Sequence, residues 1–160
     1  MRFFLCILAL LLAGCGGGLW PIDETVMQPL SVEPSSMNII WTWEVDNFSY
    51  TLIKEQYHIQ DKKVALVINE DSTFEAINFP DFVTDSFGQS INNKLLNATG
   101  RWKVEQEDAT RVLNMEFTKG ELYTWGAETS YALYSKDSQL VILDFIGDPD
   151  QGDRLLFIKR

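Results

Sequence analysis

The segment RWKVEQEDATRVLNMEFT (residues 101–118) decides the predicted fold. Large apolar side chains occupy every second position on both sides of a short polar stretch near Glu107-Asp108-Ala109. Successive side chains of a β-strand point to opposite faces, so this spacing indicates two strands that each bury one face. We therefore expect these residues to form an antiparallel hairpin.

The same period of two continues along most of the chain. We expect further strands over residues 39–45, 48–52, 57–59, 64–68, 73–78, 122–134 (one strand or two, broken near Gly126), 140–146 and 155–158. Asp46-Asn47 should turn the first two into a hairpin. Pro80 interrupts the series, and residues 80–93 should form a short helix or a loop insertion. The pattern predicts an all-β, antiparallel up-and-down meander of about 8–10 strands, either a sandwich or, preferably, a closed barrel without exposed edges.

The amino-terminal segment has the order of a signal peptide. Arg2 precedes an apolar run over residues 3–12, which is too short for the ~20 residues of a membrane-spanning helix. The run ends in Leu12-Ala13-Gly14-Cys15, which resembles the lipobox of bacterial lipoproteins. That resemblance implies cleavage after residue 14 and acylation of Cys15, whereas an ordinary secretory peptide is the alternative. Gly16, in place of the Asp that retains such proteins in the inner membrane, favours the outer membrane of the cell envelope.

Residues 15–37 should be the lipidated amino terminus and a flexible tether. Glycines, Pro21, Pro29 and Pro34 interrupt every periodic pattern in this segment. The alternative is an extended arm that docks on the domain through Trp20, Val26 and Leu30. Residues 38–160 should then form a single domain.

Charge and cysteine content limit the classes of partner. Removal of residues 1–14 leaves 160 − 14 = 146 residues and a formal charge of 12 − 23 = −11. Such a chain should be repelled by nucleic acid and by anionic lipid head groups, and a cationic partner is favoured. The alternative, which base rates favour, is that the acidic excess only maintains solubility. Cys6 leaves with the leader and Cys15 carries the lipid, so no disulfide can form in the domain.

A family resemblance covers residues 64–157. Its motifs are Ser72-Thr73-Phe74, Asn78-Phe79-Pro80, Gly100-Arg101-Trp102, and the run GDPDQGDR (residues 147–154) with Phe157. They resemble those of a group of small secreted or lipid-anchored bacterial proteins, largely without an assigned activity. The resemblance implies a lipocalin-like β-barrel and no particular chemistry. Asp71-Ser72 departs from the Asp-Gly that members often carry at this turn.

Metal and catalytic motifs are weak. Asp148, Asp150 and Asp153 are a weak candidate calcium loop, but a plain turn explains their spacing better. His58 is the sole histidine, so histidine-rich metal sites are excluded, and we expect neither an enzyme nor a cofactor. Asp144 interrupts an apolar strand and is either exposed or buried with Arg101 or Arg154 as its partner.

Two hypotheses for a membrane-anchored, non-enzymatic binding module remain. In the first, the barrel binds a small apolar ligand, and the candidate lining residues are Trp41, Trp43, Trp102, Trp125 and Tyr131. The interior of an eight-stranded barrel is only just filled by side chains, which favours core packing for the same aromatics. In the second, the domain is an inhibitor or immunity-type protein whose acidic surface binds a cationic protein.

The lipid anchor gives a first testable prediction. Chain purified from membranes should lack residues 1–14 and carry acyl mass on Cys15, while Cys15→Ser should keep the leader and gain no acyl mass. Intact-mass spectrometry measures both. A wild-type chain that keeps its leader and carries no acyl group would contradict the prediction.

Overall fold

The computed structural model describes residues 27–30, 34, 36–57, 62–81, 94–122, 127–146 and 153–160. Its elements are β1 (Met27–Pro29), α1 (Ser36–Ile39), β2 (Thr42–Val45), α2 (Asn47–Tyr57), β3 (Ala65–Ile68), β4 (Thr73–Pro80), β5 (Leu95–Glu107), β6 (Thr110–Gly120), β7 (Glu128–Lys136), β8 (Gln139–Phe145) and β9 (Arg154–Lys159). The insertion expected over residues 80–93 falls between β4 and β5, and residues 82–93 of it lie outside the described residues.

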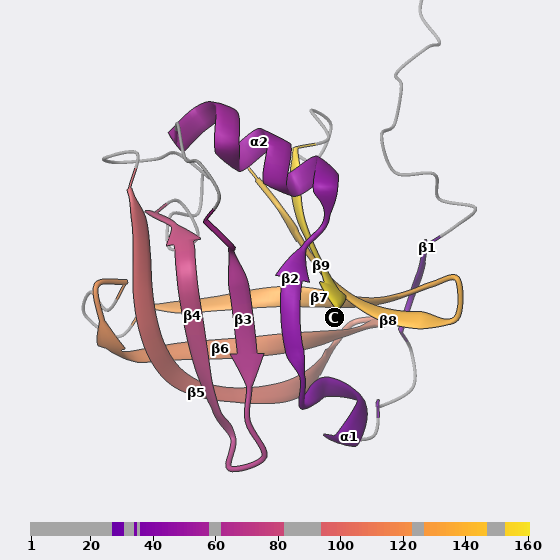
Figure 1. The fold of residues 1–160 in the computed structure, drawn as a ribbon. Coiled ribbons are helices and arrows are strands. Elements are labelled where there is room, and N and C mark those ends of the chain that lie inside the picture. Colours follow the sequence, from indigo (N-terminus) through magenta and orange to yellow (C-terminus); the bar gives the residue numbers. More distant parts are fainter. Residues whose placement is uncertain are drawn as a thin grey trace, which may run out of the picture.

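The strands form a closed antiparallel barrel (Figure 1). From β2 to β9, each strand pairs with the next in the chain, and pairing of β9 with β2 closes the ring. The segment over residues 101–118 forms the predicted hairpin, in which Glu107 pairs with Thr110. The prediction of an all-β meander that closes into a lipocalin-like barrel is therefore confirmed, and the sandwich alternative is wrong.

The prediction of a strand over residues 48–52 is wrong, because these residues belong to α2. Asp46 caps this helix: its Oδ1 accepts a hydrogen bond from Ser49 N at 2.8 Å, and its carbonyl oxygen accepts one from Tyr50 N at 2.9 Å. Ser49 and Ile53, four positions apart, share the buried face of the helix. The strand expected over residues 57–59 is also wrong at Tyr57, which ends α2, while Ile59 lies outside the described residues.

Helix α2 lies across one end of the barrel and is fastened to β9 (Figure 1). Asp46 N donates to the carbonyl oxygen of Leu156 at 2.8 Å, and Leu156 N donates to Ser49 Oγ at 2.9 Å. Ser49 is fully buried, so its hydroxyl is an internal partner of the β9 backbone rather than a surface group. These two bonds fix the start of the helix at the seam where β9 meets β2.

The opposite end of the barrel is covered by α1 (Figure 1). Ile39, expected in a strand, instead ends α1 and packs into the core. Its carbonyl oxygen accepts a hydrogen bond from Trp43 Nε1 at 2.9 Å. The first barrel strand consequently begins three residues later than predicted, at Thr42.

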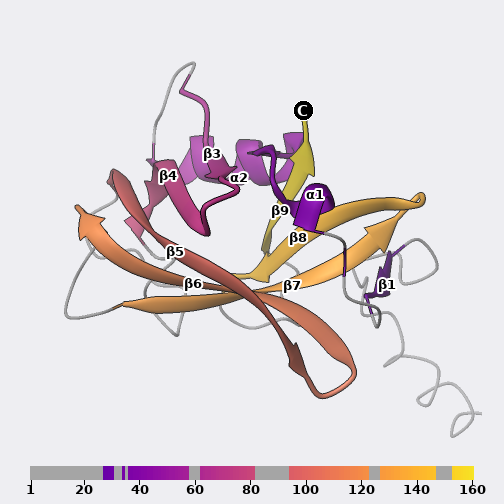
Figure 2. The same cartoon turned by 90° about the horizontal axis from the view of Figure 1, so that it is seen from below.

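Part of the predicted tether is a strand. Met27–Pro29 form β1, which pairs with β7 over Tyr134 to Lys136, along the stretch of that edge that β6 leaves free. Leu30 then bridges the two strands, because Leu30 N donates to Leu133 O and Leu30 O accepts from Arg111 N, both at 2.9 Å. The tether prediction is thus wrong for residues 27–30, and the docking alternative holds for Leu30. Figure 2 shows β1 beside the barrel.

Aromatic rings fill the middle of the barrel. Phe157 stacks on Phe79 with ring centroids 5.5 Å apart and meets Tyr131 edge-on at 6.0 Å. Phe74 and Phe117 form a further edge-on pair at 5.3 Å. All five side chains are fully buried. The interior of an eight-stranded barrel is only just wide enough for its own side chains, and here large rings occupy it.

The hydrogen bond of Ser49 to β9 gives a prediction for stability. Ser49→Ala leaves Leu156 N buried without its acceptor, so we expect a loss of about 1–3 kcal/mol in the free energy of unfolding, measured by urea denaturation. Thr51→Ala removes an exposed hydroxyl that bonds only within the same helix and serves as the control. Equal losses in the two variants would contradict the role given to Ser49.

Candidate functional site

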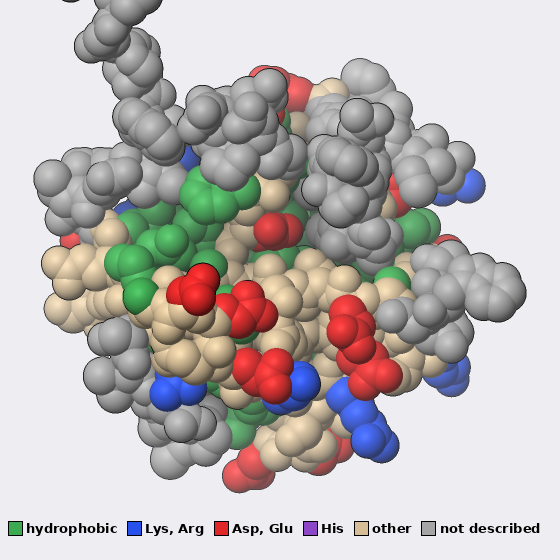
Figure 3. Space-filling view, turned by 180° about the vertical axis from the view of Figure 1, so that it is seen from behind, with side chains coloured by type: hydrophobic (Ala, Val, Ile, Leu, Met, Phe, Trp, Pro, Cys, Tyr) green, Lys and Arg blue, Asp and Glu red, His purple; other side chains and the backbone are tan. Residues whose placement is uncertain are grey.

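An open groove on the outer wall of β5, β6 and β7 is the main candidate site. It has a cavity volume of about 480 Å³ and is lined by Ser72, Arg101, Trp102, Lys103, Glu105, Glu107, Asn114, Met115, Glu116, Glu128, Thr129 and Ser130. The lining includes four glutamates and two basic residues, so its formal side-chain charge is 2 − 4 = −2. Figure 3 shows this wall from outside, with acidic side chains gathered on it and basic ones between them.

A row of polar side chains crosses the three strands in this groove. Lys103 pairs with Asn114 on β6, and Asn114 with Ser130 on β7, so all three point outward. Lys103 Nζ lies 2.9 Å from Glu105 Oε1, Asn114 Nδ2 donates to Glu105 Oε2, and Ser130 Oγ donates to Asn114 Oδ1 at 2.5 Å. Lys103, and then Asn114, lower the pKa of Glu105, so this carboxylate is ionised and already paired.

Glu116 and Glu128 differ from Glu105 because they face each other. They are direct partners in the register of β6 and β7, and both are exposed. Arg101 is opposite Glu116 on β5, yet neither glutamate forms a close ion pair with any described residue. Glu105 raises the pKa of Lys103 most, and the charges of Glu128 and Glu116 add to this from farther away. Like charges at directly opposed positions destabilise a sheet. The groove therefore carries two carboxylates that a cation from outside would stabilise.

A second polar feature lies inside the barrel. Asp144 is half-buried on the same face of β8 as the core residue Ile142, two positions away, and its charge acts on the hydroxyl of Tyr131. Burial raises the pKa of Asp144 to about 7. Burial, and then the charge of Asp144, raise the pKa of Tyr131, on which Thr129 acts weakly in the opposite direction. Tyr131 Oη forms no hydrogen bond of normal geometry within the part of the chain that the structure describes.

Asp144 is thus half-buried, between the exposed and the buried alternative, and neither predicted arginine is among the causes of its pKa shift. Arg101 is exposed on the outer wall. Arg154 lies over the ring of Phe48, with its Cζ 4.7 Å from the ring centroid. The carboxyl group instead accepts a hydrogen bond from the backbone of Phe145.

The predicted ligand-lining residues do not form one pocket. Trp43 and Tyr131 are fully buried core residues. Trp102 is half-buried against the same core, and its Nε1 donates to Asn69 O at 3.1 Å. Trp41 is 49% exposed near the carboxyl end of β9, where its indole donates to Arg160 O. Trp125 lies outside the described residues.

Residues 147–152, with Asp148 and Asp150, and also His58 lie outside the described residues. Asp153 directly precedes β9. Over the described ranges there is no group of three or more His, Cys, Asp or Glu side chains arranged to hold a metal ion. Among those same residues, no helix is both long and apolar enough to cross a membrane.

Comparisons of this chain with protein-family models, with curated proteins and with solved structures gave no match. The resemblances to bacterial lipoproteins and to small envelope barrels therefore stay predictions.

The sequence reasoning missed the opposed pair Glu116 and Glu128. Alternation in residues 113–118 already placed Glu116 on the solvent face. Its partner could not be identified, because the start of the following strand was left open between Leu122 and Gly126, whereas β7 begins at Glu128. The register of β6 and β7 was the missing information.

The buried carboxyl of Asp144 gives a pH-dependent prediction. Below about pH 4 the carboxyl is protonated in the folded and the unfolded chain, and between pH 4 and its folded pKa of about 7 only the unfolded chain loses the proton. The free energy of unfolding of the wild type should therefore fall across this interval, by up to roughly 4 kcal/mol. Asp144→Asn should remove this fall.

Urea denaturation from pH 3.5 to pH 8 measures the free energy of unfolding of the wild type and of Asp144→Asn. The difference between the two free energies at pH 3.5 is the reference against which the differences at higher pH are compared. Parallel stability curves of wild type and Asp144→Asn over this range would show that Asp144 is not buried in the folded chain.

Proposed function

We propose that this chain is a lipid-anchored, non-enzymatic binding protein of the bacterial cell envelope, and that the groove on β5, β6 and β7 binds a cationic protein. The observation that carries the proposal is the opposed pair of exposed, unpaired carboxylates, Glu116 and Glu128, at the edge of a groove of about 480 Å³.

The charge of the whole chain supports a cationic partner. A formal charge of −10 attracts such a protein over a long range, and this speeds the encounter. Contact then depends on local carboxylates. Glu105 is already held by Lys103, so Glu116 and Glu128 are the groups on which a lysine or arginine of the partner would gain most.

The packing of the interior favours a binding site on the outer wall over one inside the barrel. Trp43 and Tyr131, two of the proposed lining residues, are fully buried and packed in the core. An apolar ligand would also meet the buried polar groups of Tyr131 and Asp144. The small-ligand hypothesis is therefore the weaker of the two.

The predicted lipid at Cys15 would hold this wall at the envelope surface. Cys15 is 27 − 15 = 12 residues from Met27, where β1 fixes the chain to the barrel. Because an extended chain spans about 3.5 Å per residue, the barrel would stay within roughly 40 Å of the anchor. A partner that arrives at the membrane surface is within reach of such a module.

The test measures binding of a defined cationic protein to the immobilised full chain. Egg-white lysozyme is the probe, and its dissociation constant is measured at low and at high salt for wild type and for Glu116→Gln/Glu128→Gln. We expect the double variant to bind about tenfold more weakly at low salt, with the difference shrinking as salt rises.

The control variant is Glu55→Gln/Glu75→Gln, which makes the same change in net charge at exposed residues of α2 and β4. It should bind lysozyme within about twofold of wild type. Equal weakening in the two double variants would mean that net charge alone drives binding, and no measurable binding by wild type would also contradict the proposal.

A further inference from the structure

A second open cavity lies on the other side of the barrel, between the start of α2, the end of β2 and the residues just before β3. Its volume is about 330 Å³, and its polar lining consists of Glu44, Asn47, Tyr50, Lys62, Lys63 and Arg160. Counting side chains alone, three cations and one carboxylate give a balance of 3 − 1 = +2. In a chain with a net charge of −10, this concentration of cations is a local reversal of sign.

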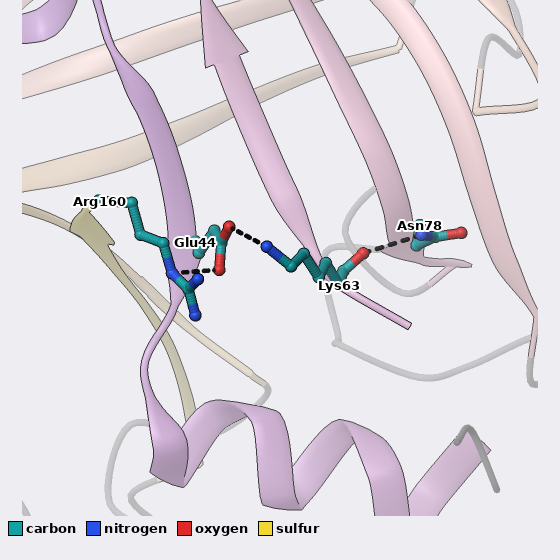
Figure 4. A network of polar contacts seen from close by, with 4 residues as sticks. All are labelled: Glu44, Lys63, Asn78 and Arg160. Atoms are coloured by element: carbon teal, nitrogen blue, oxygen red, sulfur yellow. Dashed lines mark hydrogen bonds and ion pairs between the residues drawn. The ribbon is translucent and has the colours of Figure 1, made fainter. Parts of the chain in front are cut away.

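Glu44 holds two of these cations in place (Figure 4). Arg160 Nε lies 2.6 Å from Glu44 Oε2, and Lys63 Nζ lies 3.2 Å from Glu44 Oε1. The Glu44 side chain is only 13% exposed, whereas both cations are more than half exposed. The lysine backbone is fixed as well, since Asn78 Nδ2 donates to Lys63 O at 2.8 Å.

The ion pair with Glu44 leaves donors unused. The printed contact to Glu44 is made through Nε, and the Arg160 side chain is 62% exposed, so the terminal amino groups of its guanidinium can reach an anion from solvent. Figure 4 shows one of them pointing toward α2, while the other lies beside the contact with Glu44. Asn47 and Tyr50, at the start of α2, line the same cavity. Lys62 likewise forms no ion pair with any residue that the structure describes.

We propose that this cavity binds a phosphate group. The terminal amino groups of an arginine match two oxygens of a phosphate, and two lysines add charge without fixed geometry. The hydroxyl of Tyr50 and the amide of Asn47 supply neutral donors at the same cavity. Glu44 competes with the anion for Arg160 and Lys63, because both cations contact its carboxylate when the cavity is empty.

The acidic character of the chain does not prevent this contact. At physiological salt, charges are screened over about 8 Å, so a bound anion experiences mainly the residues that line the cavity. In the ring of eight strands, β2 and β3 lie two to four places from the groove strands β5, β6 and β7, and β6 is directly opposite β2. The phosphate site and the acidic groove are therefore on opposite walls, and both can be occupied at once.

The phosphate can belong to a lipid head group or to a free phosphate, and two soluble probes distinguish these sources. Inorganic phosphate represents the free ion, and glycerophosphoglycerol, which is deacylated phosphatidylglycerol, represents the lipid head group. Isothermal titration calorimetry of the full chain in a neutral detergent should show saturable binding. Tighter binding of glycerophosphoglycerol assigns the site to a lipid, and tighter binding of inorganic phosphate assigns it to the free ion.

Three variants locate the site. Lys62→Gln/Arg160→Gln should weaken binding of the preferred probe about tenfold or more, because it removes the unpaired donors. Lys119→Gln/Lys136→Gln makes the same change in charge on β6 and β7, outside both cavities, and should leave binding within about twofold. Glu44→Gln removes the competing carboxylate and should tighten binding several-fold, a gain that misfolding cannot produce.

The proposal is overturned if the full chain binds neither probe, or if the two double variants lose affinity equally. Weaker binding by Glu44→Gln would also overturn it, because that carboxylate competes with the anion in the arrangement described here.

Discussion

The narrow interior of an eight-stranded barrel is the constraint on which the rest of this structure depends. Its width suits side chains and little else, and in this chain stacked and edge-on rings around Phe157 occupy it. Each aromatic side chain buries a large apolar area, so the core needs no disulfide and the domain contains none. Because side chains fill the interior in the described part of the chain, the proposed binding site is on the outer wall.

The two ends of the barrel are closed in a way that serves the same core. Ile39 of α1 and Ile53 of α2 are fully buried and enter the core from opposite ends. The hydrogen bonds of Asp46 and Ser49 to Leu156 hold α2 at the seam between β9 and β2. On the outside, β1 pairs with the edge of β7. Its residue Met27 packs on Val141, Leu143 and Leu156, so β1 covers an apolar part of the outer wall. The walls left for polar contacts are those with the acidic groove and the basic cavity.

The period of two predicted most strands and the hairpin over residues 101–118, because each has one apolar and one polar face. It failed over residues 47–57, where Phe48, Tyr50 and Leu52 alternate like a strand while Ser49 and Ile53 form the buried face of a helix. Asp46 was read as a turn residue, although Asp is equally favoured as a helix cap. The inward position of Asp144 could not be predicted, because both faces of β8 are apolar: Ile142 faces the core, and Leu143 faces outward beneath β1. The cavity around Glu44 joins β2, α2, β3 and the carboxyl end of the chain, so its residues come together only in the closed barrel.

The two candidate sites differ in sign and lie on opposite walls, which fits a body that contacts two surfaces at once. Binding on the outer wall and binding inside the barrel can be distinguished by whether the barrel has room for a ligand. Xenon enters dry apolar cavities in protein interiors, so a crystal structure of the full chain under xenon pressure tests this most directly. We expect no xenon atom among the rings of Trp43, Phe79, Tyr131 and Phe157. Xenon bound between these rings would contradict a filled interior and would make the inside of the barrel the leading candidate for the functional site.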